Sequence, residues 1–335
     1  MFMKKLLVIT GFVVFGVIIQ VLIWNGVVNN YYAQVLTLMS IFIILATSLN
    51  LINGITGQFS LGHAGFAAVG AYFSAIITTR LNLGLPDFLT FFLALLVGGL
   101  VAAMVGFLIG LPTLRLRGDY LAIATLGFGE IIRVLFLNWK YVGAASGMWG
   151  IPGYTNFLWA YLVAIVTVLF IVNFMHTSHG RACLSIREDE IAAETMGINT
   201  TKYKVMAFTF GAFFAGVAGG VFAHLIRLLH PQSFTFMFSV EVLLMVVLGG
   251  LGSITGSIAA AILLTTMTEA LRQFSELRMV IYALMLIGIM IFRPQGLLGT
   301  KELSTESFVK LWNWIKKLLG RSEKVGEQVD NTKDS

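Results

Sequence analysis

Long apolar segments recur along this chain and constrain its fold more than any other feature. The first runs from Leu6 to Trp24 and directly follows Lys4 and Lys5. About 20 consecutive apolar residues are enough for a helix to cross the hydrocarbon core of a bilayer. Hydrophobic residues make up 58% of the 335 positions and charged residues only 11%, which excludes a water-soluble domain and an intrinsically disordered chain. The sequence therefore predicts an all-α polytopic membrane protein.

We expect about ten membrane-spanning helices. Seven further apolar runs lie near residues 33–52, 60–79, 88–111, 120–138, 157–175, 205–228 and 279–292. The stretch 237–271 is too long for one span, and glycine and serine interrupt it between Gly249 and Gly256. We interpret it as a hairpin of two short spans.

Loop charges orient these spans, because Lys and Arg are in excess on the cytoplasmic side of membrane proteins. With the amino terminus inside, the inside loops are 53–59, 112–119 and 176–204, and the outside loops include 25–32 and 139–156. The basic residues of the inside loops are Arg115, Arg117, Arg181, Arg187, Lys202 and Lys204, whereas these two outside loops carry only Lys140. A hairpin at 237–271 returns the basic carboxy-terminal region inside. We therefore expect both termini to be cytoplasmic.

The chain divides into two parts by composition. Residues 1–300 form the expected transmembrane domain, which includes the cytoplasmic segment 176–204, and residues 301–335 form a polar tail. Apolar residues recur at helical spacing near the start of the tail: Phe308, Leu311, Trp312, Ile315, Leu318 and Leu319. With lysines among them, they predict an amphipathic helix over about 307–319 that lies on membrane lipid. We expect the residues after it to be disordered.

Two glycine-rich breaks interrupt the apolar runs, one in each half of the chain. The first lies between Asn53 and Gly65 and the second between Val247 and Gly256. Non-helical backbone at membrane depth is tolerated where protein or a water-filled cavity satisfies its polar groups, and paired broken helices indicate a solute pathway. We predict that polar residues of the first break line such a pathway: Asn50, Asn53, Gln58, Ser60 and His63. The alternative is that they satisfy the broken backbone nearby and that His63 packs within a helix bundle.

Residues 176–204 form the longest polar stretch between spans. Ser185 and Glu188 have the spacing of a capping box, and Gly197 supplies a left-handed stop. These features predict one independent helix over 186–196, about 16 Å long. A charged helix on the cytoplasmic side suits docking to another protein, and a solvated connector lying on the membrane is the alternative.

One pair of opposite charges falls inside an apolar run. Glu130 and Arg133 are three residues apart, so they share a face of the helix expected over 120–138. Because an ionised side chain is costly inside a bilayer, we expect the two to pair and to face protein or water. A structural ion pair or a position near the membrane interface is the favoured interpretation, and a contact with the transported solute is the alternative.

Several chemistries are excluded by missing motifs. No phosphate-binding G-x-x-x-x-G-K-[ST] loop occurs, so this chain supplies no ATP site of that kind. The zinc-protease, serine-hydrolase and C-x-x-C motifs are absent as well, and Cys183 is the single cysteine. A net charge of +6 spread over the whole chain is no footprint for nucleic acid. We predict a protein that is not an enzyme and that has no metal or cofactor site of its own.

Several motifs together resemble the LivM type of branched-chain amino acid ABC transporter permeases. They are residues 48–66, 112–126, 180–182, 186–199, 249–253 and 293–297, and the resemblance extends over about residues 35–300. One departure concerns the general permease signature, Glu-Ala-Ala with Gly four residues on. Here Ile191 stands in place of the glutamate before Ala192, Ala193 and Gly197, so detailed contacts with an ATPase cannot be transferred.

The resemblance implies a type II ABC-importer-like arrangement in a bacterial inner membrane. The partners it implies are a second permease of the LivH type, two cytoplasmic ATPase subunits that bind ATP, and a soluble extracytoplasmic binding protein. It also implies that the 176–204 segment couples to the ATPases through Ser185, Arg187, Glu188, Asp189, Glu190, Ala192, Ala193, Glu194 and Gly197. The solute is expected to be a branched-chain or other hydrophobic amino acid. Urea, short amides or aromatic acids remain alternatives, as does a gradient-driven transporter or channel.

Overall fold

The computed structural model describes residues 2–81, 84–116, 118–272, 280–281, 283–284, 287–288 and 296, with side chains from Thr10 onward. The expected span over 279–292 is described at only a few positions. The tail helix over 307–319 and the expected disorder after it lie outside the described residues.

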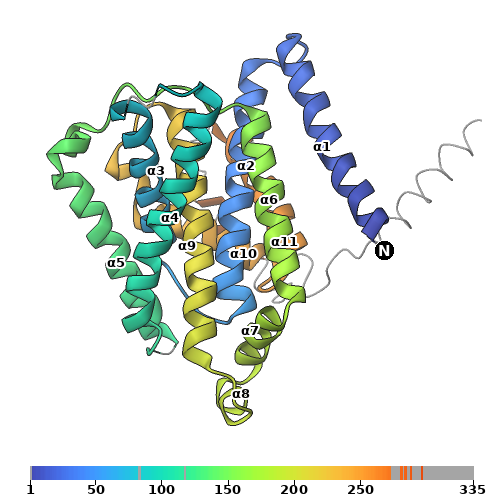
Figure 1. The fold of residues 1–335 in the computed structure, drawn as a ribbon, viewed down its shortest axis with the longest axis vertical. Helices are drawn as coiled ribbons and strands as arrows, with labels where there is room; N and C mark the ends of the chain where they lie inside the picture. The colour runs from blue at the N-terminus through green and yellow to red at the C-terminus, as the bar shows by residue number, and fades with distance from the viewer. Residues whose placement is uncertain are drawn as a thin grey trace, which may run out of the picture. The chain divides into compact units, whose positions relative to one another are not determined.

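Every regular element within the described residues is a helix (Figure 1). The α-helices are α1 (Phe2–Trp24), α2 (Asn30–Asn50), α3 (His63–Arg80), α4 (Asp87–Thr113), α5 (Asp119–Asn138), α6 (Phe157–His176), α7 (Ser178–Glu188), α8 (Glu190–Thr195), α9 (Thr200–Ile226), α10 (Phe236–Gly249) and α11 (Ile254–Ala270). Five segments within α2, α4, α5, α6 and α9 are long and apolar enough to cross a membrane. The polytopic helical class is thereby confirmed.

Most predicted runs correspond to helices with similar ends. The run 88–111 is α4 and the run 157–175 is α6. Helix α9 begins at Thr200, five residues before the predicted start, because the side chain of Asn199 accepts a hydrogen bond from the Lys202 backbone N–H at 3.0 Å. The predicted break within 237–271 is confirmed, since α10 ends at Gly249 and α11 begins at Ile254.

Small residues let α3, α4 and α9 approach one another closely in the centre of the bundle (Figure 1). A Cβ atom on Gly98 of α4 would lie 2.7 Å from the carbonyl oxygen of Gly70 in α3. A Cβ on Gly70 would collide with the backbone of Gly216 in α9. Since even a methyl group does not fit, backbone-to-backbone contact defines this core.

Helices α7 and α8 lie together at one end of the bundle, and the turn between α1 and α2 lies at the opposite end (Figure 1). The prediction of one helix over 186–196 is wrong, because Asp189 separates α7 from α8 with an extended backbone (φ −157°, ψ 110°). Ser185 caps neither helix, and its hydroxyl donates to the carbonyl oxygens of Arg181 and Ala182 within α7. The cap of α8 is Asp189, whose carboxylate accepts from the N–H groups of residues 191 and 192 at 2.9 and 3.0 Å.

Candidate functional site: two helix breaks and the 178–199 segment

Helix α2 ends in an unusual wide turn. Residues Leu51–Ile55 form a short π-helix, η1, and all five are buried. The hydroxyl of Thr56 donates to the carbonyl oxygen of Leu51 at 2.9 Å, which stabilises the end of the turn. The chain then runs without regular structure to the start of α3 at His63. Short π-helical turns are rare and are frequent at functional sites.

The two breaks predicted from sequence contact each other through Asn50. Its amide group donates to the carbonyl oxygen of Ser253 at 2.9 Å and accepts from the backbone N–H of Gly252 at 2.8 Å. A Cβ atom on Gly54 would collide with the same Gly252 N–H. Asn50 is fully buried, so it joins η1 to the connection between α10 and α11.

The other polar residues of the first break also bond to the protein. Asn53 and Ser60 exchange two hydrogen bonds at 3.2 and 3.3 Å between the Asn53 amide and the Ser60 backbone. Gln58 donates to the carbonyl oxygen of Lys204 at 3.1 Å, and His63 pairs with the Ser48 hydroxyl at 2.9 Å. These bonds agree with the alternative that the side chains satisfy broken backbone and that His63 is packed. Their part in translocation stays a prediction.

Arg187 lies against both breaks. Gly57 has a left-handed backbone (φ +72°), and a Cβ atom there would lie 3.3 Å from the Arg187 Cα. The Arg187 Nη1 atom lies against Gly252 in the second break. Since η1 and α10 both end in this region, their carbonyl groups favour a cation. Arg187 therefore connects α7 to the two breaks at once.

A second connection starts at α8. Glu190 forms an ion pair with Lys204 of α9, with 2.6 Å between Oε2 and Nζ, and the Lys204 side chain is only 10% exposed. The Lys204 carbonyl is the oxygen that Gln58 binds. Helix α8 is thus joined through α9 to the loop that follows η1. Lys204 was not predicted as a site residue, because its partners Glu190 and Gln58 are distant from it in sequence.

The outer surface of α8 faces away from the bundle. Of the predicted coupling residues, Glu188, Asp189, Ala192, Glu194 and Gly197 are exposed and Ala193 is buried. Ile191 and Met196 are 65% and 82% exposed, so two large apolar side chains lie on the surface of α8 and directly after it. Gly197 has φ +84°, which confirms the predicted left-handed stop. The exposed apolar side chains were not predicted, because the charged residues around them gave the stronger sequence signal.

The predicted ion pair within α5 is present. The Arg133 Nε donates to the Glu130 Oε2 at 2.7 Å, and the two side chains are 22% and 34% exposed. Glu130 also lines a narrow pocket between α5, the start of α3 and the start of α10.

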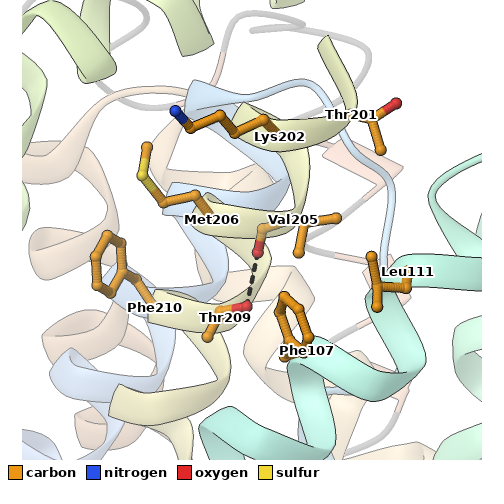
Figure 2. A pocket seen from close by; sticks show the side chains of 8 residues that line it. All are labelled: Phe107, Leu111, Thr201, Lys202, Val205, Met206, Thr209 and Phe210. Atoms are coloured by element: carbon orange, nitrogen blue, oxygen red, sulfur yellow. Dashed lines mark hydrogen bonds between the residues drawn. The ribbon is translucent and has the colours of Figure 1, made fainter. Parts of the chain in front are cut away.

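A larger hollow lies elsewhere, between α4 and α9 (Figure 2). It has a volume of about 390 Å³ and is open to the outside. Its lining residues are Phe107, Leu111, Thr201, Lys202, Val205, Met206, Thr209 and Phe210. None of the predicted site residues is among them. The Thr209 hydroxyl donates to the carbonyl oxygen of Val205 at 2.7 Å, as drawn in Figure 2.

Paired helix breaks within an apolar helical bundle define a membrane permease, and comparison with known proteins identifies its kind. The chain belongs to the family described as branched-chain amino acid transport system / permease component, which matches residues 31–291. It is 40% identical over 310 aligned residues to the high-affinity branched-chain amino acid transport system permease protein LivM of Escherichia coli, covering 82% of this chain and 72% of that protein.

More distant relatives include a second type of permease protein. The permease protein LivH of Escherichia coli is 28% identical over 294 aligned residues, covering 79% of this chain and 94% of LivH. A probable LivM of Methanocaldococcus jannaschii is 22% identical over 334 aligned residues, covering 83% and 96%. No solved structure matches the chain.

Proposed function

We propose that this chain is a transmembrane subunit of an ATP-driven importer for branched-chain or other hydrophobic amino acids. The observation that carries the proposal is the attachment of the 178–199 segment to both helix breaks. In this view α8 receives a movement from a separate ATPase and passes it to the region where the spans are interrupted.

The exposed tip of α8 supports the docking role. Ile191 and Met196 are apolar and largely exposed at the end of the bundle, and burying such side chains against a partner is favourable at about 25 cal/mol per Å². The acidic residues around them add charges that a basic partner surface would complement. A solvated connector has no need for two exposed large apolar residues.

The proposed cycle is alternating access. Closure of two ATPase subunits on ATP displaces α8, and the Glu190–Lys204 ion pair carries this displacement to α9. Arg187 moves with α7 and shifts the two breaks, where glycine-rich backbone absorbs the change in dihedral angles. The spans then reorient and expose the solute pathway to the other side.

The proposed assembly has four kinds of subunit. This chain pairs with a LivH-type permease, two ATPase subunits bind on the cytoplasmic side, and a soluble binding protein delivers the solute from outside. We place the chain in the bacterial inner membrane with about ten spans and both termini cytoplasmic. ATP binds on the partner subunits alone.

Reconstitution of the four-component complex in liposomes tests the proposal. We expect uptake of radiolabelled leucine that requires both ATP and the binding protein. Met196→Asp should remove the ATPase subunits from the purified complex and abolish uptake. Val27→Asp is the control, because Val27 is 71% exposed in the turn between α1 and α2, and that turn lies at the opposite end of the bundle from α8 (Figure 1). Uptake driven by an ion gradient without ATPase subunits would refute the proposal.

A further inference from the structure

The ion pair of α5 is partly exposed, where a purely structural pair would be expected to be enclosed. Glu130 is the twelfth residue of α5, about 16 Å along a helix that is about 30 Å long. It therefore lies near the middle of a segment that can cross a membrane. Charged side chains at that depth face protein or water and mark solute or ion pathways.

The pair uses only part of its bonding capacity. Within the described residues, the Nε of Arg133 is the one guanidinium nitrogen that forms a hydrogen bond, and Oε2 is the one carboxylate oxygen of Glu130 that accepts. An arginine has five N–H donors, and a carboxylate accepts at both oxygens. Both Nη groups and Oε1 are thus open to a further partner.

A pocket adjoins the carboxylate. Its lining combines the first break, α5 and the start of α10: Leu61, Ala64, Leu126, Gly129, Glu130, Phe234, Thr235, Phe236 and Ser239. Glu130 is the single charged member, and leucine and phenylalanine side chains supply an apolar wall. One side is closed by a hydrogen bond of 2.9 Å from the Ala64 N–H to the Ser239 hydroxyl.

We propose that Glu130 and Arg133 form a binding site for a zwitterionic solute with an apolar side chain. The solute ammonium bonds to Glu130, its carboxylate takes the free Nη groups of Arg133 in a bidentate pair, and its side chain enters the pocket beside Leu126. The internal ion pair neutralises both charges while the site is empty. This inference rests on the proposed function, and it names the residues that contact the solute.

The pocket is closed around the site in this structure. Its volume is only about 10 Å³, so an amino acid enters only after α5 moves away from α3 and α10. Helix α5 is suited to such a movement, because it is the least buried of the five long apolar helices. Its tight contact is with the first break, where a Cβ atom on Gly62 would lie 2.6 Å from the Thr125 carbonyl oxygen. Movement of that break therefore moves the wall of the site.

A variant in which Glu130 and Arg133 exchange places distinguishes a solute-binding role of the pair from a purely structural role. The double variant Glu130→Arg/Arg133→Glu keeps an ion pair on the same helix turn but presents each charge at the wrong position. We expect leucine uptake by the reconstituted complex to fall at least tenfold, while the subunits still assemble. The control Asp119→Asn removes an exposed carboxylate at the start of the same helix and should leave uptake within twofold of wild type.

Two further measurements guard against misfolding. The neutral variant Glu130→Gln/Arg133→Gln removes both charges from an apolar region, and it should assemble and also lose at least tenfold in uptake. In the wild-type complex, leucine with its binding protein should slow the labelling of Glu130 by dicyclohexylcarbodiimide at least threefold, as read by peptide mass spectrometry. Uptake within twofold of wild type in either assembled variant, or unchanged labelling, overturns the inference. Failure of the proposed function gives a different result, no leucine uptake by the wild-type complex, and overturns this inference with it.

Discussion

The contact between the two breaks makes Asn50→Ala the most informative single substitution. Asn50 is fully buried, and its side chain bonds to one backbone donor and one backbone acceptor more than 200 positions away. In the variant the Gly252 N–H has no partner, which costs about 1–3 kcal/mol. The Ser253 carbonyl keeps its bonds from Ser257 at 3.0 and 3.1 Å, so losing Asn50 there costs about 0.5–1 kcal/mol. The expected destabilisation is about 1.5–4 kcal/mol in total.

Thermal unfolding of the purified complex in detergent measures this effect. At about 2–4 °C per kcal/mol, the apparent midpoint should fall by roughly 3–16 °C. Asn138→Ala is the matched control, because Asn138 makes a single exposed bond to the Val134 carbonyl oxygen at 2.8 Å. We expect that variant to lie within about 0.5 kcal/mol of wild type. Equal midpoints for the two variants would refute the conclusion that Asn50 joins the breaks.

Three other outcomes are expected from the same region. Gly57→Ala should destabilise the complex by about 1 kcal/mol more than Gly26→Ala. Both positions have a left-handed backbone, but only Gly57 contacts α7. Equal unfolding midpoints for the two variants would contradict that contact. Lys204→Ala should cost between about 1 and 3 kcal/mol, since it removes the ion pair between α9 and a partly buried carboxylate of α8. The exposed Lys202→Ala should cost under about 0.5 kcal/mol in the same assay. Burial raises the pKa of the Cys183 thiol to about 11, so maleimide should label the folded protein negligibly at pH 7.5 and faster only as pH rises toward 11; rapid labelling at pH 7.5 would show an accessible thiolate.

The long spans could be predicted from the sequence because their evidence is local. A membrane helix needs a continuous apolar run, and the run itself gives its place and approximate length. The predicted run 120–138 and the observed α5 (Asp119–Asn138) differ by one residue at the start. The pairing of Glu130 with Arg133 could be predicted from their spacing on one helix, and the structure contains this ion pair.

The 178–199 segment shows where local evidence fails. Ser185 and Asp189 are both residue types that cap helices, and their spacing alone does not choose between them. Burial determines which of the two residues is the cap. Cys183 and Ile186 are both buried within α7, so the helix continues through Ser185. The bonds of Asn50 and Lys204 join positions far apart in the chain, so one sequence carried no sign of them.

The glycine contacts among α3, α4 and α9 have a practical consequence. Because three backbones touch where no methyl group fits, sliding any one of these helices past the others would require the whole seam to separate. We therefore expect the trio to act as a fixed frame of reference during the proposed transport cycle. Spin labels on the outer sides of α4 and α9 should keep a constant separation through the cycle, and distances from that frame to labels on α5 or α8 would report how far the working parts travel.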